Sequence, residues 1–415
     1  MCIGLCKKAK FEIVNNPEEA EIIIINTCGF IESAKEEAIN CILEMAEYKK
    51  QNCKYLVAMG CLVQRYKNDL EKTIPEVDRF ISIDEYEKFG DIILELTNIK
   101  SNSKNTLDYL DRVVSTGDKT AYLKIAEGCS NRCTYCAIPY IRGPYISRKK
   151  EDILDEAKKL AEDGYEEIIV IAQDTTKYGI DIYGKEKLAE LLHEISKIEK
   201  IKWIRFLYAY PESITDELIF EVKNNPKICK YFDIPLQHFS DNVLKRMNRK
   251  SNSQKIKELL EKLRKEIPEV VIRTTVIVGF PGETEDDFFE LYEFISEAKF
   301  EKLGAFKYSK EDGTPAAKLD KQVHYKTKQS RYNKIMAMQQ KISKIKLEEK
   351  IGNTYEVLID GLSEDGKYYI GRSYMDIPDE DGVIYIKNNQ SNLCGKFIKC
   401  KITGVINYDL IGNVE

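Results

Sequence analysis

The stretch Glu127-Gly-Cys129-Ser-Asn-Arg-Cys133-Thr-Tyr-Cys136-Ala-Ile-Pro139 places three cysteines in one short loop with C-x3-C-x2-C spacing. A loop of this length can wrap three thiolates around one metal centre. No fourth ligand is close in sequence, whereas a closed structural zinc site requires four. A [4Fe–4S] cluster held by three cysteines keeps one iron open for another ligand. The spacing therefore predicts an iron–sulfur site, and a tight loop with three unrelated thiols is the alternative interpretation.

The loop resembles the signature of the radical S-adenosylmethionine (radical SAM) superfamily, in which an aromatic residue, here Tyr135, precedes the last cysteine. The resemblance implies that Cys129, Cys133 and Cys136 hold a [4Fe–4S] cluster whose open iron binds SAM. It also implies that one electron from the cluster cleaves SAM to methionine and a 5′-deoxyadenosyl radical. In such enzymes the cofactor supplies the difficult chemistry and the protein positions it.

Length and composition exclude several classes of protein. The chain has 415 residues, enough for two or three domains, with 43% apolar residues, 32% charged residues and a net charge of −5. No apolar run approaches the ~18 residues that span a membrane, and residues 1–11 lack the apolar core of a signal peptide, so we expect a cytoplasmic protein without a membrane partner. Twelve cysteines in a reducing compartment favour metal ligation over disulfides. With three histidines, no H-E-x-x-H and no G-x-x-x-x-G-K-[ST], a histidine-based zinc enzyme and a P-loop nucleotide site are both disfavoured.

Residues 1–98 alternate between strand and helix patterns, which predicts a doubly wound α/β domain. The expected helix spans residues 33–50, with Ser33 as its N-cap and Glu36 completing a capping box. The expected strands are residues 11–14, 22–25, 55–59 and 79–82.

Two further cysteines directly follow two of these strands. Cys28 lies in Asn26-Thr-Cys-Gly-Phe30, and Cys61 lies in Met59-Gly-Cys-Leu62. Open parallel sheets place ligand sites at the carboxyl ends of their strands, so we expect both loops at one rim of the sheet. Two ordinary half-buried thiols are the alternative.

The run from Asn26 to Glu37, followed by Met59-Gly-Cys61, resembles the amino-terminal domain of the methylthiotransferases. More narrowly, it resembles the branch that methylthiolates an aspartate of ribosomal protein S-twelve. That resemblance implies a second, auxiliary [4Fe–4S] cluster on three cysteines, of which Cys28 and Cys61 match the second and third. The loop that carries the first, S-L-G-C-x-K-N, has no match here, and we expect a misplaced start codon. Cys2 and Cys6 share one helix face and are expected to pack rather than to bind metal.

Residues 99–120 are rich in Ser, Asn, Lys and Asp and are expected to form a linker. Residues 121–346 repeat strand then helix six times, which suits a partial, open-sided (β/α)6 barrel, the radical SAM core fold. The cysteine loop follows the first strand, which places the cluster at the carboxyl-terminal mouth of the barrel. The expected strands are residues 121–126, 167–172, 202–208, 231–235, 271–278 and 303–308.

Residues that follow the later strands resemble the same family and are candidates for contacts to SAM and substrate. The predicted cofactor-binding residues are Gln173, Asp174, Gln237, Gly279 and Gly282. The two glycines would let the backbone approach the adenosine closely, and the alternative is a tight turn with a helix cap at Thr284. No catalytic acid or base is assigned.

Three other side chains near these loops leave alternatives open. His238 is expected to be structural more often than catalytic. Arg142 and Arg148, just past the cysteine loop, are equally consistent with carboxylate contacts and with ordinary surface positions.

A helical connector at residues 324–349 leads to a β-rich segment, residues 351–415, with turn signals at Asp360-Gly361, Asp365-Gly366 and Asp381-Gly382. These predict a small five-stranded antiparallel barrel of OB type, which resembles the family's TRAM domain. The last domain is predicted to span residues 347–415.

The carboxyl-terminal segment is acidic. Residues 350–415 contain seven Lys/Arg and ten Asp/Glu, a net charge of −3. This charge suits a basic protein partner better than RNA, so no stable nucleic-acid binding is expected. The expected contact is an acidic group, Asp376, Asp379, Glu380 and Asp381, with a solvated turn as the alternative.

The resulting prediction is a radical SAM aspartate methylthiotransferase acting on ribosomal protein S-twelve. It requires two [4Fe–4S] clusters, SAM and a flavodoxin- or ferredoxin-like electron donor. One alternative is a tRNA adenosine methylthiotransferase, and another is a non-catalytic iron–sulfur redox or RNA-binding module.

Overall fold

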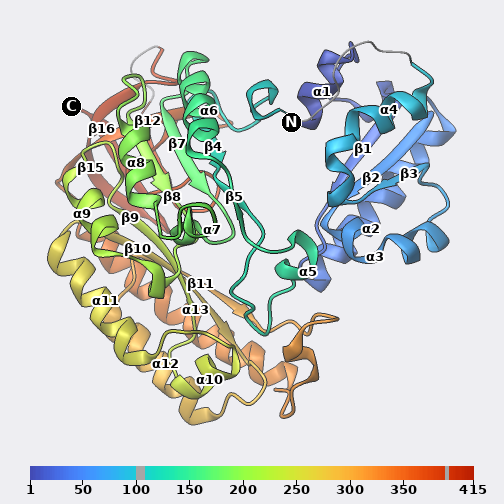
Figure 1. Ribbon diagram of the computed structural model, residues 1–415. Coiled ribbons are helices and arrows are strands. Elements are labelled where there is room, and N and C mark those ends of the chain that lie inside the picture. Colours follow the sequence, from blue (N-terminus) through green and yellow to red (C-terminus); the bar gives the residue numbers. More distant parts are fainter. Residues whose placement is uncertain (100–107, 388–391) are drawn as a thin grey trace. The chain divides into compact units, whose positions relative to one another are not determined.

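The computed structural model describes residues 1–99, 108–387 and 392–415 (Figure 1). The predicted linker, residues 99–120, lies partly outside the described residues. The chain forms two compact units. The cysteine loop belongs to the first unit, whereas the strands before and after this loop belong to the second. The predicted boundaries at residues 98, 120 and 346 stay predictions. The first unit comprises Met1–Ser115, Gly128–Pro144 and Ser309–Ala317, and the second comprises Thr116–Glu127, Tyr145–Tyr308 and Lys318–Glu415.

The first unit is built on a parallel sheet with the strand order β1-β2-β3, covered on both faces as the doubly wound prediction requires. Leu56 and Ala58 of β2 pack with α2 and α3, whereas Val57 and Met59 pack with α1 and α4. This alternation gives the sheet two apolar faces. The elements are α1 (Cys2–Lys8), β1 (Ile22–Thr27), α2 (Glu32–Ala46), β2 (Tyr55–Gly60), α3 (Cys61–Thr73), β3 (Arg79–Ile81), α4 (Phe89–Thr97) and α5 (Ile138–Arg142).

Two local predictions in this unit are wrong. Residues 11–14 form no strand, and the side chains of Ile13 and Val14 are exposed, because no described segment pairs with them. The capping box at Ser33 is also absent. Helix α2 begins one residue earlier, at Glu32, and no side chain of its N-cap residue caps it.

The second unit contains six parallel strands in two sheets, β4-β7-β8 and β9-β10-β11, and Ile204 of β8 forms an isolated bridge with Ile228, which lies just before β9. Each strand leads to a helix, which confirms the predicted open barrel of six β/α units. The strands are β4 (Thr120–Lys124), β7 (Glu167–Ile171), β8 (Trp203–Phe206), β9 (Tyr231–Gln237), β10 (Val271–Val278) and β11 (Lys302–Lys307). The main helices are α6 (Lys150–Glu162), α8 (Leu188–Ser196), α9 (Asp216–Asn224), α11 (Ser253–Glu266), α12 (Glu285–Ala298) and α13 (Tyr325–Glu348).

The last part of the second unit is the predicted five-stranded barrel, closed in the order β12-β13-β14-β16-β15. One pair, β14 with β16, is parallel, so the barrel is not wholly antiparallel. The predicted turn at Asp365-Gly366 joins β12 to β13. Asp360-Gly361 instead forms a bulge inside β12, where Asp360 binds Nε of Arg372 at 2.7 Å. The strands are β12 (Thr354–Leu362), β13 (Tyr368–Arg372), β14 (Ile384–Lys387), β15 (Phe397–Ile406) and β16 (Asp409–Val414).

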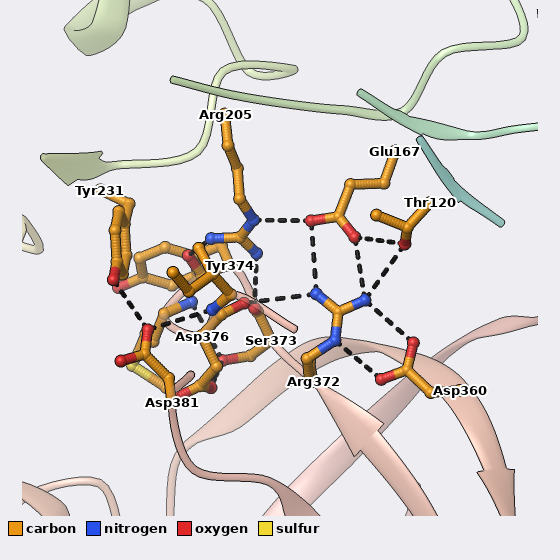
Figure 2. Close-up of polar contacts among 12 residues, drawn as sticks. Thr120, Glu167, Arg205, Tyr231, Asp360, Arg372, Ser373, Tyr374, Asp376 and Asp381 are labelled. Carbon is orange, nitrogen blue, oxygen red and sulfur yellow. Dashed lines mark hydrogen bonds and ion pairs between the residues drawn. The ribbon is translucent and has the colours of Figure 1, made fainter. Parts of the chain in front are cut away.

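This barrel packs against the strands of the β/α barrel around a buried ion network (Figure 2). The Glu167 carboxylate accepts hydrogen bonds from Nε of Arg205 at 2.6 Å and from Nη2 of Arg372 at 2.9 Å. Burial alone would raise the pKa of Glu167, but the two guanidinium groups outweigh it and lower the pKa to about 2. The network therefore joins β7 and β8 to β13 through a fixed negative charge.

The acidic group predicted to meet a basic partner is largely used inside this unit. Asp376 is buried and lies 2.6 Å from the ammonium group of Lys302. The Asp381 carboxylate accepts a hydrogen bond from a tyrosine of β9 at 2.7 Å. The prediction is therefore wrong for these two residues, because packing against β9 and β11 pairs them internally. Asp379 and Glu380 remain exposed.

No helix in the described part of the chain combines the length and the apolar character that crossing a membrane requires.

Candidate functional site

The loop with C-x3-C-x2-C spacing lies between β5 (Ala126–Glu127) and α5, and its backbone is closed by hydrogen bonds. The N–H of Cys129 donates to the carbonyl of Gly143 at 3.1 Å, and the N–H of Cys136 donates to the carbonyl of Cys133 at 3.0 Å. Cys129 and Cys133 are buried and Cys136 is partly exposed. The three thiols therefore belong to one compact loop with restricted access.

The start and the end of this loop approach each other at Gly128. Its φ of +75° lies in the left-handed region, and a Cβ at this position would overlap the carbonyl oxygen of Pro144. Only glycine fits here, so the shape of the cysteine loop depends on this residue.

Cys28 and Cys61 lie at one rim of the first unit's sheet, as predicted. Cys28 follows the last residue of β1, and Cys61 is the first residue of α3. The two loops are in contact, because a Cβ on Gly29 would lie only 2.6 Å from Cα of Leu62. Cys28 is exposed and Cys61 is partly exposed, so both thiols are accessible to a ligand.

One contact joins this rim to the helix that ends the cysteine loop, and a second joins the loop to the segment Ser309–Ala317. Nη2 of Arg142, the last residue of α5, lies 3.4 Å from Sγ of Cys61. The backbone N–H of Ala316 donates to the carbonyl of Thr134, inside the cysteine loop, at 2.9 Å. All five cysteines predicted to bind metal thus belong to one compact unit.

The segment Ser309–Ala317, which contacts the cysteine loop, also contacts the rim. Nη1 and Nη2 of Arg65 donate to the carbonyls of Gly29 and Asp312, at 2.6 and 2.8 Å. The buried carboxylate of Glu311 accepts a hydrogen bond from the backbone N–H of Glu32 at 3.0 Å. Glu311 is not among the residues predicted from the sequence, although it follows the sixth strand just as the predicted residues follow strands two to five.

The predicted SAM-binding residues lie in the second unit, at the carboxyl ends of its strands. Gln173 is partly exposed and donates from Nε2 to the Glu127 carboxylate at 3.0 Å. Asp174 is fully buried, and its carboxylate accepts a hydrogen bond from Thr176 at 2.6 Å. Gln237 has a φ of +71°, which is unusual for a residue other than glycine. Contact of these residues with SAM stays a prediction.

The two predicted glycines lie in the turn between β10 and α12. Gly279 and Gly282 have φ values of +73° and +86°, and the side chain of Arg246 approaches Gly282 closely. Thr284 caps α12 in a capping box with Asp287. The turn with a cap is therefore present, and an approach of the glycines to adenosine stays a prediction.

His238 is deeply buried, and its structural role stays a prediction, since its Nε2 is buried without a hydrogen-bond partner among the described residues. Its side chain is fully buried, and burial lowers its pKa to about 3. Its Nδ1 accepts a hydrogen bond from the N–H of Ser240 at 3.1 Å. Arg148 contacts a carboxylate, that of Glu156, at 2.6 Å.

Cys2 and Cys6 take the packing role expected of them. Cys6 is buried between α1 and the sheet, and Cys2 packs against the same core. Burial raises the pKa of Cys2, and it raises the pKa of Cys6 to about 11. Such thiols are poor metal ligands because the thiolate is the ligating form.

The described residues contain no group of three Cys, His, Asp or Glu side chains already gathered around one point for a metal ion. The fit to an iron–sulfur cluster therefore rests on the donor set. Three thiols in one closed loop, without a fourth cysteine in the C-x3-C-x2-C segment, match a [4Fe–4S] cluster with one open iron. Metal sites of this kind commonly assemble as the metal binds.

Comparison with known proteins identifies the family. The chain is 62% identical over 99% of its length, and over 94% of the relative, to ribosomal protein uS12 methylthiotransferase RimO of Alkaliphilus oremlandii. The chain belongs to the RimO family. A second RimO, from Acetivibrio thermocellus, is 50% identical over 99% of the chain and 94% of the relative. Family descriptions match at residues 1–82 (uncharacterized protein family UPF0004), 123–295 (radical SAM superfamily) and 351–414 (TRAM domain).

Solved structures agree on the fold of this RimO family member. The radical SAM methyltransferase TsrM from Kitasatospora setae, solved with cobalamin and a [4Fe–4S] cluster, matches with a TM-score of 0.55. It is 13% identical and covers 75% of this chain and 67% of that one. Membership of the radical SAM superfamily implies one [4Fe–4S] cluster and SAM as cofactors.

Proposed function

We propose that this chain is a radical SAM methylthiotransferase that adds a methylthio group to the β-carbon of an aspartate in ribosomal protein uS12. The observation that carries the proposal is the 62% identity to a RimO over nearly the whole chain, together with the intact cysteine loop. The chemistry supports a radical route. The C–H bond at the β-carbon of the target is strong and its hydrogen is not acidic, so a general base cannot remove it as a proton. A ribosomal substrate also places the enzyme in the cytoplasm.

Cys129, Cys133 and Cys136 would hold the first cluster, which when bound supplies the radical chemistry by cleaving SAM. The protein's task is to orient SAM and to exclude water. We assign the orienting role to Gln173, Asp174, Gln237, Gly279 and Gly282, which follow strands of the β/α barrel. The cleavage of SAM also requires an electron, which a donor resembling flavodoxin or ferredoxin would supply.

Cys28 and Cys61 would contribute to an auxiliary [4Fe–4S] cluster, which would present the methylated sulfur to the substrate. Their support is the shared rim at the ends of β1 and β2. The contact of Arg142 with Cys61 adds a link to the SAM-cleaving loop. We do not propose a third ligand from the residues of this chain.

The experiment that tests the function deletes the gene and restores it either as this chain or as its Cys133→Ala variant. Intact small-subunit ribosomal proteins are then weighed, and tRNA nucleosides are analysed in parallel. The expected result is that uS12 loses one methylthio group on deletion and regains it only with the unaltered chain, while tRNA is unchanged. Loss of a methylthio-adenosine from tRNA with unchanged uS12 would instead identify a tRNA enzyme.

A further inference from the structure

Helix α13 carries an excess of positive charge that its packing does not use. Residues 325–347 contain seven Lys/Arg and no Asp or Glu, in a chain whose net charge is −5. Two of these basic residues are used within the second unit, where Arg331 is buried and pairs with Glu283, and Lys346 pairs with Glu301. The exposed lysines of the helix are Lys326, Lys334, Lys341 and Lys344.

The exposed lysines lie on one face of α13. At about 100° of rotation and 1.5 Å of rise per residue, they occupy a sector of about 80° and span about 27 Å along the helix axis. The buried face, which includes Ile335 and Ile342, is on the opposite side. Lys344 lies 3.9 Å from Glu348. Lys326, Lys334 and Lys341 form no ion pair with any described carboxylate, and we call these three the lysine stripe.

The lysine stripe is only one helix wide. Helix α12, which packs against α13 (Figure 1), is acidic on its exposed side, where Glu290, Glu293 and Glu297 lie. A flat anionic surface such as a membrane would meet both helices, and the carboxylates of α12 would repel it. A narrow chain of phosphates can instead follow α13 alone and take the lysines as its counterions. The charge pattern therefore favours a nucleic acid over a membrane.

An exposed aromatic ring lies at the start of the stripe. Tyr325, the first residue of α13, is 63% exposed, and the ammonium group of Lys307 lies 4.8 Å from the centre of its ring. An exposed ring beside lysines is typical of surfaces that stack an unpaired base and hold the adjacent phosphates. The loops and bulges of RNA supply unpaired bases, whereas a DNA duplex keeps its bases stacked. This neighbour therefore favours RNA.

We propose that the lysine stripe binds the phosphates of ribosomal RNA, with Tyr325 stacked on an unpaired base beside them. The choice of ribosomal RNA rests on the proposed function, because an enzyme that modifies uS12 in the small ribosomal subunit meets that RNA next to its substrate. The acidic segment at residues 350–415, whose charge predicts no stable nucleic-acid binding, lies outside the stripe. The contact with RNA therefore comes from the connector helix and not from the last barrel.

The test measures how tightly the full-length chain binds small-subunit ribosomal RNA, transcribed in vitro, at several KCl concentrations. One variant combines Lys326→Gln, Lys334→Gln and Lys341→Gln, and a second variant carries Arg at the same three positions. The matched control replaces three exposed lysines of α11 with Gln, which removes the same charge from another exposed helix of the second unit. These control lysines, among which glutamates also lie, are Lys255, Lys262 and Lys265. Circular dichroism checks that every variant is folded.

The slope of log Kd against log [KCl] should fall by about 2 in the Gln variant of the stripe, because each lost phosphate contact removes about 0.7 from it. The Arg variant and the α11 control should keep the slope of the unaltered chain. An unchanged slope in the Gln variant, or an equal fall in the α11 control, would overturn the inference. Binding to phosphatidylglycerol vesicles without binding to RNA would overturn it as well. None of these outcomes affects the methylthiotransferase proposal, which the weighing of uS12 tests separately.

Discussion

The carboxylate of Glu311 accepts a hydrogen bond from the backbone N–H of Glu32, at 3.0 Å and across 279 residues of sequence. This contact satisfies one of the free N–H groups at the start of α2, which its N-cap residue does not cap. The same carboxylate lies 3.5 Å from the ammonium group of Lys35 and 3.6 Å from Nη1 of Arg65. One buried carboxylate therefore holds the beginning of the helix that follows Cys28.

Replacing Glu311 with Ala should loosen this helix start. We expect a loss of about 1–3 kcal/mol, because Lys35 and Arg65 lose a buried partner and the Glu32 N–H loses its acceptor. The measurement is hydrogen exchange of the amides at residues 31–36, with urea unfolding as a second readout. Glu36→Ala is the control, because Glu36 is exposed on the same helix and makes no capping box. A larger effect at Glu36 than at Glu311 would contradict this account of the helix start.

Glu167→Gln should destabilise the second unit strongly. The side chains of Glu167 and Arg205 are both fully buried, and Arg372 is nearly so. Removing the negative charge leaves the buried guanidinium of Arg205 without its counterion and leaves Arg372 with Asp360 alone, for which we expect a loss of about 3–5 kcal/mol in urea unfolding. Asp155→Asn, which breaks an exposed pair with Lys158, should leave the midpoint unchanged. Similar midpoints for both variants would show that the network does not stabilise the fold.

The same carboxylate predicts a dependence of stability on pH. The pKa of Glu167 in the folded chain is about 2, below its ordinary value of 4.5. A lowered pKa means that the ionised group stabilises the fold above the ordinary value, and that this stabilisation is lost as the pH falls from 4.5 to about 2. Unfolding measured across this window should show a steeper loss for the unaltered chain than for Glu167→Gln. Parallel curves of unfolding free energy against pH for the two proteins would contradict the assignment of this loss to Glu167.

The elements that the sequence predicts well are those with a local signal. The strand β2 is a nearly continuous apolar run, as expected of a parallel strand buried on both faces, and it lies where predicted. The strand β10 contains Arg273, Thr274 and Thr275 between its apolar residues, and it also lies where predicted. The cysteine loop is recognised by spacing alone. The contact of Glu311 with Glu32 has no such signal, since it joins residues 279 positions apart.

The net charge of a segment is the least reliable predictor of where its side chains lie. The segment around Asp376 is acidic, but its net charge does not reveal that Asp376 is paired with Lys302 of β11. Likewise, Asp360-Gly361 has the composition of a turn, yet Asp360 is held inside a strand by Arg372. In both cases a tertiary ion pair, invisible in the local sequence, decides the conformation.

Gly128→Ala should prevent the cysteine loop from holding its cluster. Gly128 and Gly143 both have a positive φ, +75° and +74°, so alanine strains the backbone at both positions. They differ in space, because a Cβ at Gly128 would overlap the carbonyl oxygen of Pro144, whereas nothing lies within 4 Å of a Cβ at Gly143.

We therefore expect Gly128→Ala to lose most of the iron bound by Cys129, Cys133 and Cys136 after anaerobic reconstitution, with the far-ultraviolet circular dichroism retained. Gly143→Ala should keep more of that iron than Gly128→Ala, because it adds backbone strain of about 1–3 kcal/mol without the overlap that forces the loop apart. Iron analysis and the absorbance of the cluster provide the measurement. Equal iron in the two variants would show that backbone strain, rather than the close approach at Pro144, governs the loop.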